Sequence, residues 1–160
     1  MSKVISIDPG YERLGIAVIS KKNGKECLEY SECFKTSKDD DQEVRLRQIG
    51  EQISKIIEKF KPAALAIESL FFNTNQKTAI KVAEARGVVM NEASKAELKV
   101  FEYTPPQIKL AITGYGKSDK TSVMKMIPKL IKIEKEIKSD DEMDAIGVGL
   151  TCLAHEQLND

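Results

Sequence analysis

Four carboxylates are distinguished by their positions along the chain. Asp8 and Glu68 each directly follow a short run of apolar residues, and Asp141 and Asp144 lie three residues apart in an otherwise largely apolar stretch. Carboxylate oxygens are the ligands that Mg²⁺ and Mn²⁺ prefer. Two such ions can activate water and stabilise the leaving oxygen of a phosphodiester. The pattern therefore predicts a Mg²⁺ site, which Mn²⁺ could also fill, and metal-dependent cutting of nucleic acid.

The pair Asp8 and Glu68 is weaker evidence for a metal site than the pair Asp141 and Asp144. Asp8 precedes Pro9-Gly10 and could simply form a turn, and Glu68 could be a solvated strand end. Asp141 and Asp144 instead share a helical face with residues such as Ala145. A buried helix that carries inward carboxylates needs a cation, whereas Asp140 and Glu142 are typical of helix N-terminal charges.

Other metal chemistry is not indicated. The three cysteines, Cys27, Cys33 and Cys152, have no Cys-x-x-Cys spacing, and the single histidine is His155. Neither a zinc site nor a disulfide framework is predicted, so the cysteines are interpreted as small apolar residues.

The charge is zero overall but unevenly distributed. Residues 1–75 carry 12 basic and 12 acidic side chains, residues 76–138 carry 13 and 7, and residues 139–160 carry none and 6. A basic middle could follow a phosphate backbone while an acidic end binds cations. Ordinary solvated helix faces would give the same pattern, so charge alone does not decide between them.

Five strands and five helices should position these residues. The five strands are expected at residues 4–7, 15–20, 27–34, 63–67 and 98–102. The helices are expected at residues 44–60, 76–95, 105–112, 119–132 and from a Ser139-x-x-Glu142 capping box to about 155. Pro128 should kink or interrupt the fourth helix. The order predicts an α/β fold with a mixed five-stranded sheet flanked by helices, in which Asp8 and Glu68 reach the same edge if their strands are parallel neighbours.

Length and composition set the remaining limits. The 160 residues, 41% hydrophobic and 31% charged, fit one domain spanning residues 1–160. No run reaches the roughly 18 apolar residues of a membrane span, and no signal peptide is evident, so a cytoplasmic protein is expected. The Gly116-Lys117-Ser118 stretch is similar to a phosphate-binding P-loop but lacks the required earlier glycine, where Ala111 stands.

Six segments together resemble the RuvC family of Holliday-junction resolvases over nearly the whole chain. They are Ile7-Asp8-Pro9-Gly10 with Gly15, Ala66-Ile67-Glu68 followed by Phe71, Ala85-Arg86-Gly87, Val100-Phe101-Glu102-Tyr103, Gly114-Tyr115-Gly116, and Asp141-Glu142-Met143-Asp144-Ala145. The resemblance implies a ribonuclease-H-like fold, a homodimer that uses Mg²⁺, paired cuts in four-way DNA junctions, and cooperation with a branch-migration complex.

The same resemblance implies roles for individual residues. The catalytic, metal-binding acids match Asp8, Glu68, Asp141 and Asp144. Phe71 matches an aromatic that stacks on unpaired junction bases, and Lys109 and Lys120 match basic residues near the scissile phosphates. One of the neighbours Phe71 and Phe72 should point outward, and Lys117 lies in a basic glycine-containing loop, so both Phe72 and Lys117 join the expected DNA-binding residues.

The helix at residues 76–95 is the candidate dimer contact. Ala79, Ala83, Gly87 and Met90 form one stripe of mostly small residues, while apolar side chains including Ile80 and Val89 are expected elsewhere. Two apolar faces suggest two partners, the sheet and a second subunit, although a helix buried within one chain fits as well. Two other functions remain open: a ribosomal-RNA processing nuclease of similar fold, and a catalytically inactive junction-binding module.

Overall fold

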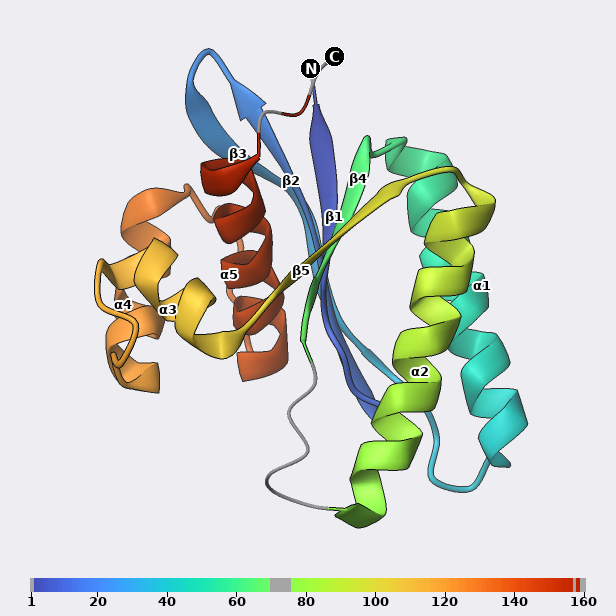
Figure 1. The fold of residues 1–160 in the computed structure, drawn as a ribbon. Helices are drawn as coiled ribbons and strands as arrows, with labels where there is room; N and C mark the ends of the chain where they lie inside the picture. The colour runs from blue at the N-terminus through green and yellow to red at the C-terminus, as the bar shows by residue number, and fades with distance from the viewer. Residues whose placement is uncertain (1, 70–75, 157, 159–160) are drawn as a thin grey trace.

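A mixed five-stranded sheet lies between two groups of helices in the computed structural model, which describes residues 2–69, 76–156 and 158 (Figure 1). The strands are β1 (Lys3–Asp8), β2 (Arg13–Lys22), β3 (Lys25–Lys35), β4 (Ala64–Glu68) and β5 (Lys99–Tyr103). Their order in the sheet is β3-β2-β1-β4-β5, with antiparallel pairing among the first three and parallel pairing of β1 with β4 and of β4 with β5. The predicted mixed sheet is confirmed, with boundaries within two residues of those expected.

The helices are α1 (Gln42–Phe60), α2 (Gln76–Lys95), α3 (Pro105–Thr113), α4 (Lys120–Leu130) and α5 (Asp140–His155). Helices α1 and α2 cover one face of the sheet, and α5 covers the other with α3 and α4 beside it (Figure 1). No helix among the described residues is both long and apolar enough to cross a membrane.

Alternation along the strands decides which side chains meet which helices. On β1, Ile5 and Ile7 pack in the cluster beneath α1 and α2, while Val4 joins the cluster around α5. On β4, Ala66 belongs to the α5 side. Because successive side chains of a strand point to opposite faces, the even-numbered strand ends of both β1 and β4 are directed toward α5.

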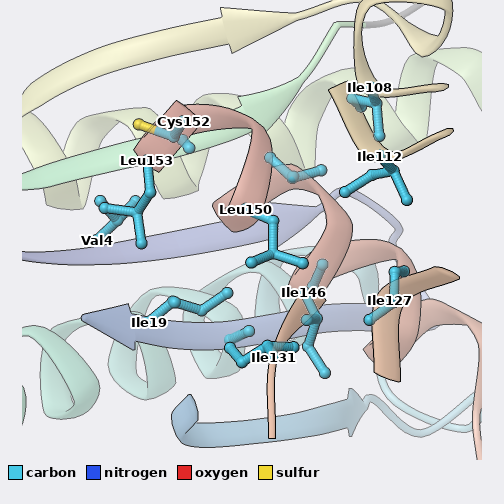
Figure 2. Close-up of a cluster of buried hydrophobic side chains, with 14 of the residues drawn as sticks. Val4, Ile19, Ile108, Ile112, Ile127, Ile131, Ile146, Leu150, Cys152 and Leu153 are labelled. Carbon is cyan, nitrogen blue, oxygen red and sulfur yellow. The ribbon is translucent and has the colours of Figure 1, made fainter. Parts of the chain in front are cut away.

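Helix α5 is the most buried helix, and every residue from 145 to 153 is inaccessible or nearly so. Figure 2 shows its side chains Ile146 and Leu150 among residues of the sheet, α3 and α4. Gly149 permits a close approach to the sheet, since a Cβ there would lie 2.6 Å from Ser6 Oγ. The Ser6 hydroxyl in turn donates a 2.7 Å hydrogen bond to the Ala145 carbonyl. The helix is thus fixed to the middle of the sheet.

The start of α5 differs from the prediction. Ser139 is the N-cap as expected and accepts a hydrogen bond from the Asp141 amide at 3.2 Å. Glu142 does not complete a capping box, because its carboxylate is buried and bonds Ser31 and Lys135 instead. A charged partner stabilises a buried carboxylate more than a backbone amide at the helix start would. The capping box that the structure does contain joins Thr104 and Gln107 at α3.

Pro128 does not interrupt α4, although the sequence predicted that it would kink or interrupt the helix. The helix runs past it to Leu130, and the Ile131 amide still donates to the Ile127 carbonyl at 3.1 Å. Pro128 lies in the last turn, where its missing N–H removes only one helical hydrogen bond. The proline is therefore tolerated because it lies close to the C-terminal end of the helix.

One face of α2 packs inward and the other is exposed. Val89 and Ala93 are fully buried on the inner face, away from the small-residue stripe. Ile80 was expected away from the small-residue stripe but is 68% exposed and lies on the same outer side as Ala83 and Gly87, which are also exposed. Positions 80, 83 and 87 are separated by three and four residues, so they share a helical face.

Candidate active site

Two of the predicted acids meet at one edge of the sheet. In the parallel pairing of β1 with β4, Ile7 lies opposite Ile67, and the next residues are Asp8 and Glu68. Both strand ends are directed toward α5 by alternation. The prediction that these two acids emerge together is therefore confirmed.

Glycine at position 15 brings the start of α5 to the same place. A Cβ on Gly15 would lie 1.9 Å from the Asp141 carbonyl oxygen and 3.1 Å from the Asp8 Cβ. Only a residue without a side chain lets the first turn of α5 rest on β2 beside the end of β1. This contact places Asp141 next to Asp8, and Asp144 follows one turn later on the same helix.

The raised pKa values of Asp8, Glu68 and Asp144 indicate that these acids lie within electrostatic reach of one another. Burial, and then the neighbouring Glu68, Asp144 and Asp141, raise the pKa of Asp8 to about 8. Burial and then Asp144 raise the pKa of Glu68 to about 7. The pKa of Asp144 is raised mainly by burial, and Lys120 opposes that rise. Negative charge is thus concentrated where carboxylates are poorly solvated, a setting that a cation would stabilise.

Each α5 acid also has partners within the chain. Lys120 Nζ lies 3.2 Å from Asp144 Oδ2 and 3.3 Å from Asp140 Oδ2. Asp141 Oδ2 accepts hydrogen bonds from Ser139 Oγ at 3.0 Å and Cys33 Sγ at 3.8 Å. Within the described residues, no three acidic, histidine or cysteine side chains are grouped so that they could already hold a metal ion.

A cleft of about 230 Å³ opens beside the acids between α3, α4 and α5. Glu68, Asp144, Lys109 and Lys120 line it together with apolar residues of the three helices. Both lysines lower the pKa of Glu68, so they lie within electrostatic reach of the acids. The lysines can bind the negatively charged phosphate of a phosphodiester, while the adjacent carboxylates can bind a cation.

Of the other predicted DNA-binding residues, the structure describes only Lys117. Lys117 is exposed in the loop between α3 and α4. Phe71 and Phe72 lie outside the described residues, so their predicted contacts stay predictions.

Sequence reasoning missed the side chains that support the acids. Ser31, Cys33 and Lys135 come from β3 and from the segment between α4 and α5, and they contact Asp141 or its neighbour Glu142. Glu142 did carry a signal, because it begins a helix that is apolar for most of its length. The two β3 residues and the lysine carried none, since their contacts depend on the tertiary structure.

Comparison with known proteins gives the family. The sequence model of the protein family named crossover junction endodeoxyribonuclease RuvC matches residues 4–152 of this chain. The RuvC protein of Thermosipho melanesiensis is 44% identical over 154 residues, covering 96% of this chain and 98% of the relative. The chain belongs to the RuvC family. The RuvC protein of Petrotoga mobilis is 42% identical over 144 residues, covering 89% of this chain and 88% of the relative.

A solved RuvC structure shares the fold described above. It is Thermus thermophilus RuvC in complex with a Holliday junction substrate, which has a TM-score of 0.90, is 30% identical, and covers 97% of this chain and 94% of that one. The predicted RuvC resemblance and ribonuclease-H-like fold class are confirmed. RuvC proteins are metal-dependent nucleases, so the predicted enzyme class is confirmed as well.

Proposed function

We propose that this chain resolves four-way DNA junctions by hydrolysing phosphodiesters at the edge formed by β1, β4 and α5. The observation that carries the proposal is the convergence of Asp8, Glu68 and Asp144, whose pKa values are all raised. Family membership supplies the substrate class, because a RuvC relative has been solved with a Holliday junction. Residues 1–160 act as a single nuclease domain in this proposal.

Asp8, Glu68, Asp141 and Asp144 would hold the divalent cation, and Mg²⁺ fits them best because all four offer hard carboxylate oxygens. Mn²⁺ has the same ligand preference and should substitute. When bound, the metal supplies water activation and stabilisation of the charge on the leaving oxygen.

The chain's own residues orient the substrate. Lys109 and Lys120 share the cleft with Glu68 and Asp144, so a phosphate bound by the lysines would lie beside the acids. Lys120 can contact either the acids or the DNA. Lys117 would follow the backbone further out, and an aromatic ring at Phe71 or Phe72 would stabilise an unstacked base without reading its identity.

Two copies of the chain would act together. A four-way junction has near two-fold symmetry, which a homodimer can match with one acid cluster on each of two equivalent strands. A branch-migration complex and a cytoplasmic location, where such junctions form, belong to the same proposal.

The two other functions make different predictions. A ribosomal-RNA processing nuclease would cut structured RNA in preference to DNA, and an inactive module would bind junctions without cutting them. The direct test is to incubate the purified protein with a labelled synthetic four-way DNA junction, a linear duplex and a structured RNA, with and without Mg²⁺. Paired cuts in the junction alone, and only with the metal, are expected. Cutting of the RNA alone, or junction binding without cutting, would contradict the proposal.

A further inference from the structure

Glu142 is a buried acid next to the proposed metal site that takes no part in it. Its side chain is 8% exposed, although it lies between Asp141 and Asp144 in sequence. Ser31 Oγ donates to Glu142 Oε1 at 2.7 Å, and Lys135 Nζ pairs with the same carboxylate oxygen. The Lys135 ammonium also donates to the Ser31 carbonyl at 2.5 Å. The three residues therefore form a closed network in which each contacts the other two.

This network joins three parts of the chain. Ser31 is on the edge strand β3, Glu142 is in the first turn of α5, and Lys135 is in the segment that links α4 to α5. The same segment also pairs with the edge strand through an isolated parallel bridge between Cys27 and Lys132. The network thus fixes the start of α5 from the side opposite to β1.

Asp141 is held by the same strand. Ser31 and Cys33 are two residues apart in β3, so their side chains point to the same face, and Cys33 Sγ contacts Asp141 Oδ2. The Asp141 carbonyl meanwhile rests against Gly15 of β2. A shift of Glu142 away from Ser31 would therefore move Asp141 relative to Asp8.

Because the Glu142 carboxylate is buried, its contacts with Lys135 and Ser31 should be kept. A buried carboxylate that loses its cation is left uncompensated and must protonate, admit water or move outward. Each response weakens the contacts that tie Glu142 to β3, and outward movement would displace the first turn of α5. Groups that orient metal ligands from behind typically change metal affinity or activity by roughly 10- to 100-fold when they are removed.

We propose that Lys135, Glu142 and Ser31 form a positioning network that sets the placement of Asp141 and Asp144 and thereby the affinity of the site for a divalent cation. This inference rests on the proposed function of the four acids. None of the three residues needs to touch the metal or the DNA.

The test is a calorimetric titration of Mn²⁺ into the protein of residues 1–160. Lys135→Met keeps the length of the side chain and removes its charge, and it should weaken Mn²⁺ binding by roughly tenfold. Lys135→Arg can keep the pair with Glu142 and should bind within about twofold of the wild type. Lys132→Met is the matched control, because Lys132 is exposed in the same segment and pairs only with the exposed Glu134 among the ion pairs of the described residues.

Cleavage of a labelled four-way junction gives a second readout. Lys135→Met should need more Mn²⁺ for half-maximal cutting and should recover nearly the wild-type rate at saturating Mn²⁺. Unchanged Mn²⁺ affinity in a folded Lys135→Met, or an equal loss in Lys132→Met, would overturn the proposal. A rate that stays low at saturating metal would overturn it as well.

Two further variants keep the outcomes distinct. If Lys135→Met does not fold, Ser31→Ala carries the test, because it removes one hydrogen bond and no charge and should still weaken Mn²⁺ binding severalfold. Unchanged affinity there would also overturn the network. Asp8→Asn tests the underlying site: if it binds Mn²⁺ as the wild type does, the site assignment fails, whereas a loss in Asp8→Asn without one in Lys135→Met refutes the network alone.

Discussion

Asp8 occupies the position least favourable to a negative charge. It lies partly buried at the end of β1, and three other acids add to the effect of burial on its pKa. Lys120 is the cation that opposes this rise. A side chain in this position is suited to a bound divalent cation and contributes little to the surface that would meet DNA.

Replacement of Asp8 by Asn should therefore abolish junction cutting and leave junction binding intact. The change removes metal charge but little backbone-binding surface. Cutting is measured on a labelled four-way junction with Mg²⁺, and binding by gel retardation without metal. Asp140→Asn is the control, because Asp140 is largely exposed and contacts only Lys120 among the ion pairs of the described residues. Normal cutting by Asp8→Asn would refute the site, and a greater loss in Asp140→Asn than in Asp141→Asn would mean that Asp140 is the ligand.

The raised pKa of Asp8 also predicts how stability depends on pH. The pKa rises from 3.8 to about 8 on folding, so between these values the folded chain keeps a proton that the unfolded chain releases. The contribution of Asp8 to folding stability is then greatest below the unfolded pKa. It falls by about 1.4 kcal/mol for each pH unit as the pH rises toward 8. Asn has no such proton to lose.

Asp8→Asn should consequently raise the melting temperature of the metal-free protein, and the gain should grow from pH 5 to pH 8. Thermal unfolding followed by circular dichroism in EDTA measures it. Glu51→Gln serves as the control, since Glu51 is 68% exposed on α1 and should give a difference independent of pH. A gain for Asp8→Asn that is the same at both pH values would show that folding does not raise the pKa of Asp8.

Helix α5 carries two of the four acids, so its contact with the sheet decides the geometry of the site. That contact depends on glycines at the closest approaches, above all Gly15 against the Asp141 carbonyl. The obstructing atom belongs to the backbone and cannot rotate away, so the first turn of α5 would have to move.

Gly15→Ala should destabilise the fold by about 1 to 3 kcal/mol, as overpacking typically does, and should abolish junction cutting. Urea unfolding and the labelled-junction assay measure the two effects. Gly147→Ala on α5 is the matched control, because its added Cβ would make ordinary contacts of 3.5 Å with Ile127 and 3.7 Å with Ile108. Equal effects of the two substitutions would mean that the approach at Gly15 has no special role.

The elements were largely predictable because their signals are local. Apolar runs ending in a turn or a proline mark β1 and β4, and helical periodicity marks α1. The convergence of Asp8 with Glu68 followed once their strands were taken as parallel neighbours. Asp141 and Asp144 could be inferred because charged residues on an apolar helix face are costly unless they bind something.

The predictions failed where tertiary contacts override a local signal. Glu142 fits a capping box in sequence, yet its buried carboxylate instead contacts Lys135 and a serine from a distant strand. Ile80 has an apolar side chain that would favour the core, but its position on α2 faces outward. Pro128 was expected to kink or interrupt the helix, yet the helix runs past it and ends two residues later.

The whole molecule presents an unusual surface on α2. Its outer side combines the exposed Ile80 with small residues at Ala83 and Gly87, while the inner side is already packed on the sheet and α1. Small residues permit close helix approach, and an exposed isoleucine gains by being covered. This surface remains the predicted contact for a second copy, now with Ile80 included.

Ala83→Arg should therefore convert a homodimer into a monomer that nicks junctions without cutting both strands together. A large charged side chain in a close helix contact would be desolvated without a partner, which opposes association. Light scattering gives the mass in solution, and a cruciform plasmid separates nicked circles from linear product. Ser54→Arg is the control, because it adds the same charge on the exposed side of α1. A monomeric Ala83→Arg that still linearises plasmid at the wild-type rate would show that paired cutting needs no dimer. A dimeric, fully active Ala83→Arg would place the dimer contact elsewhere on the molecule.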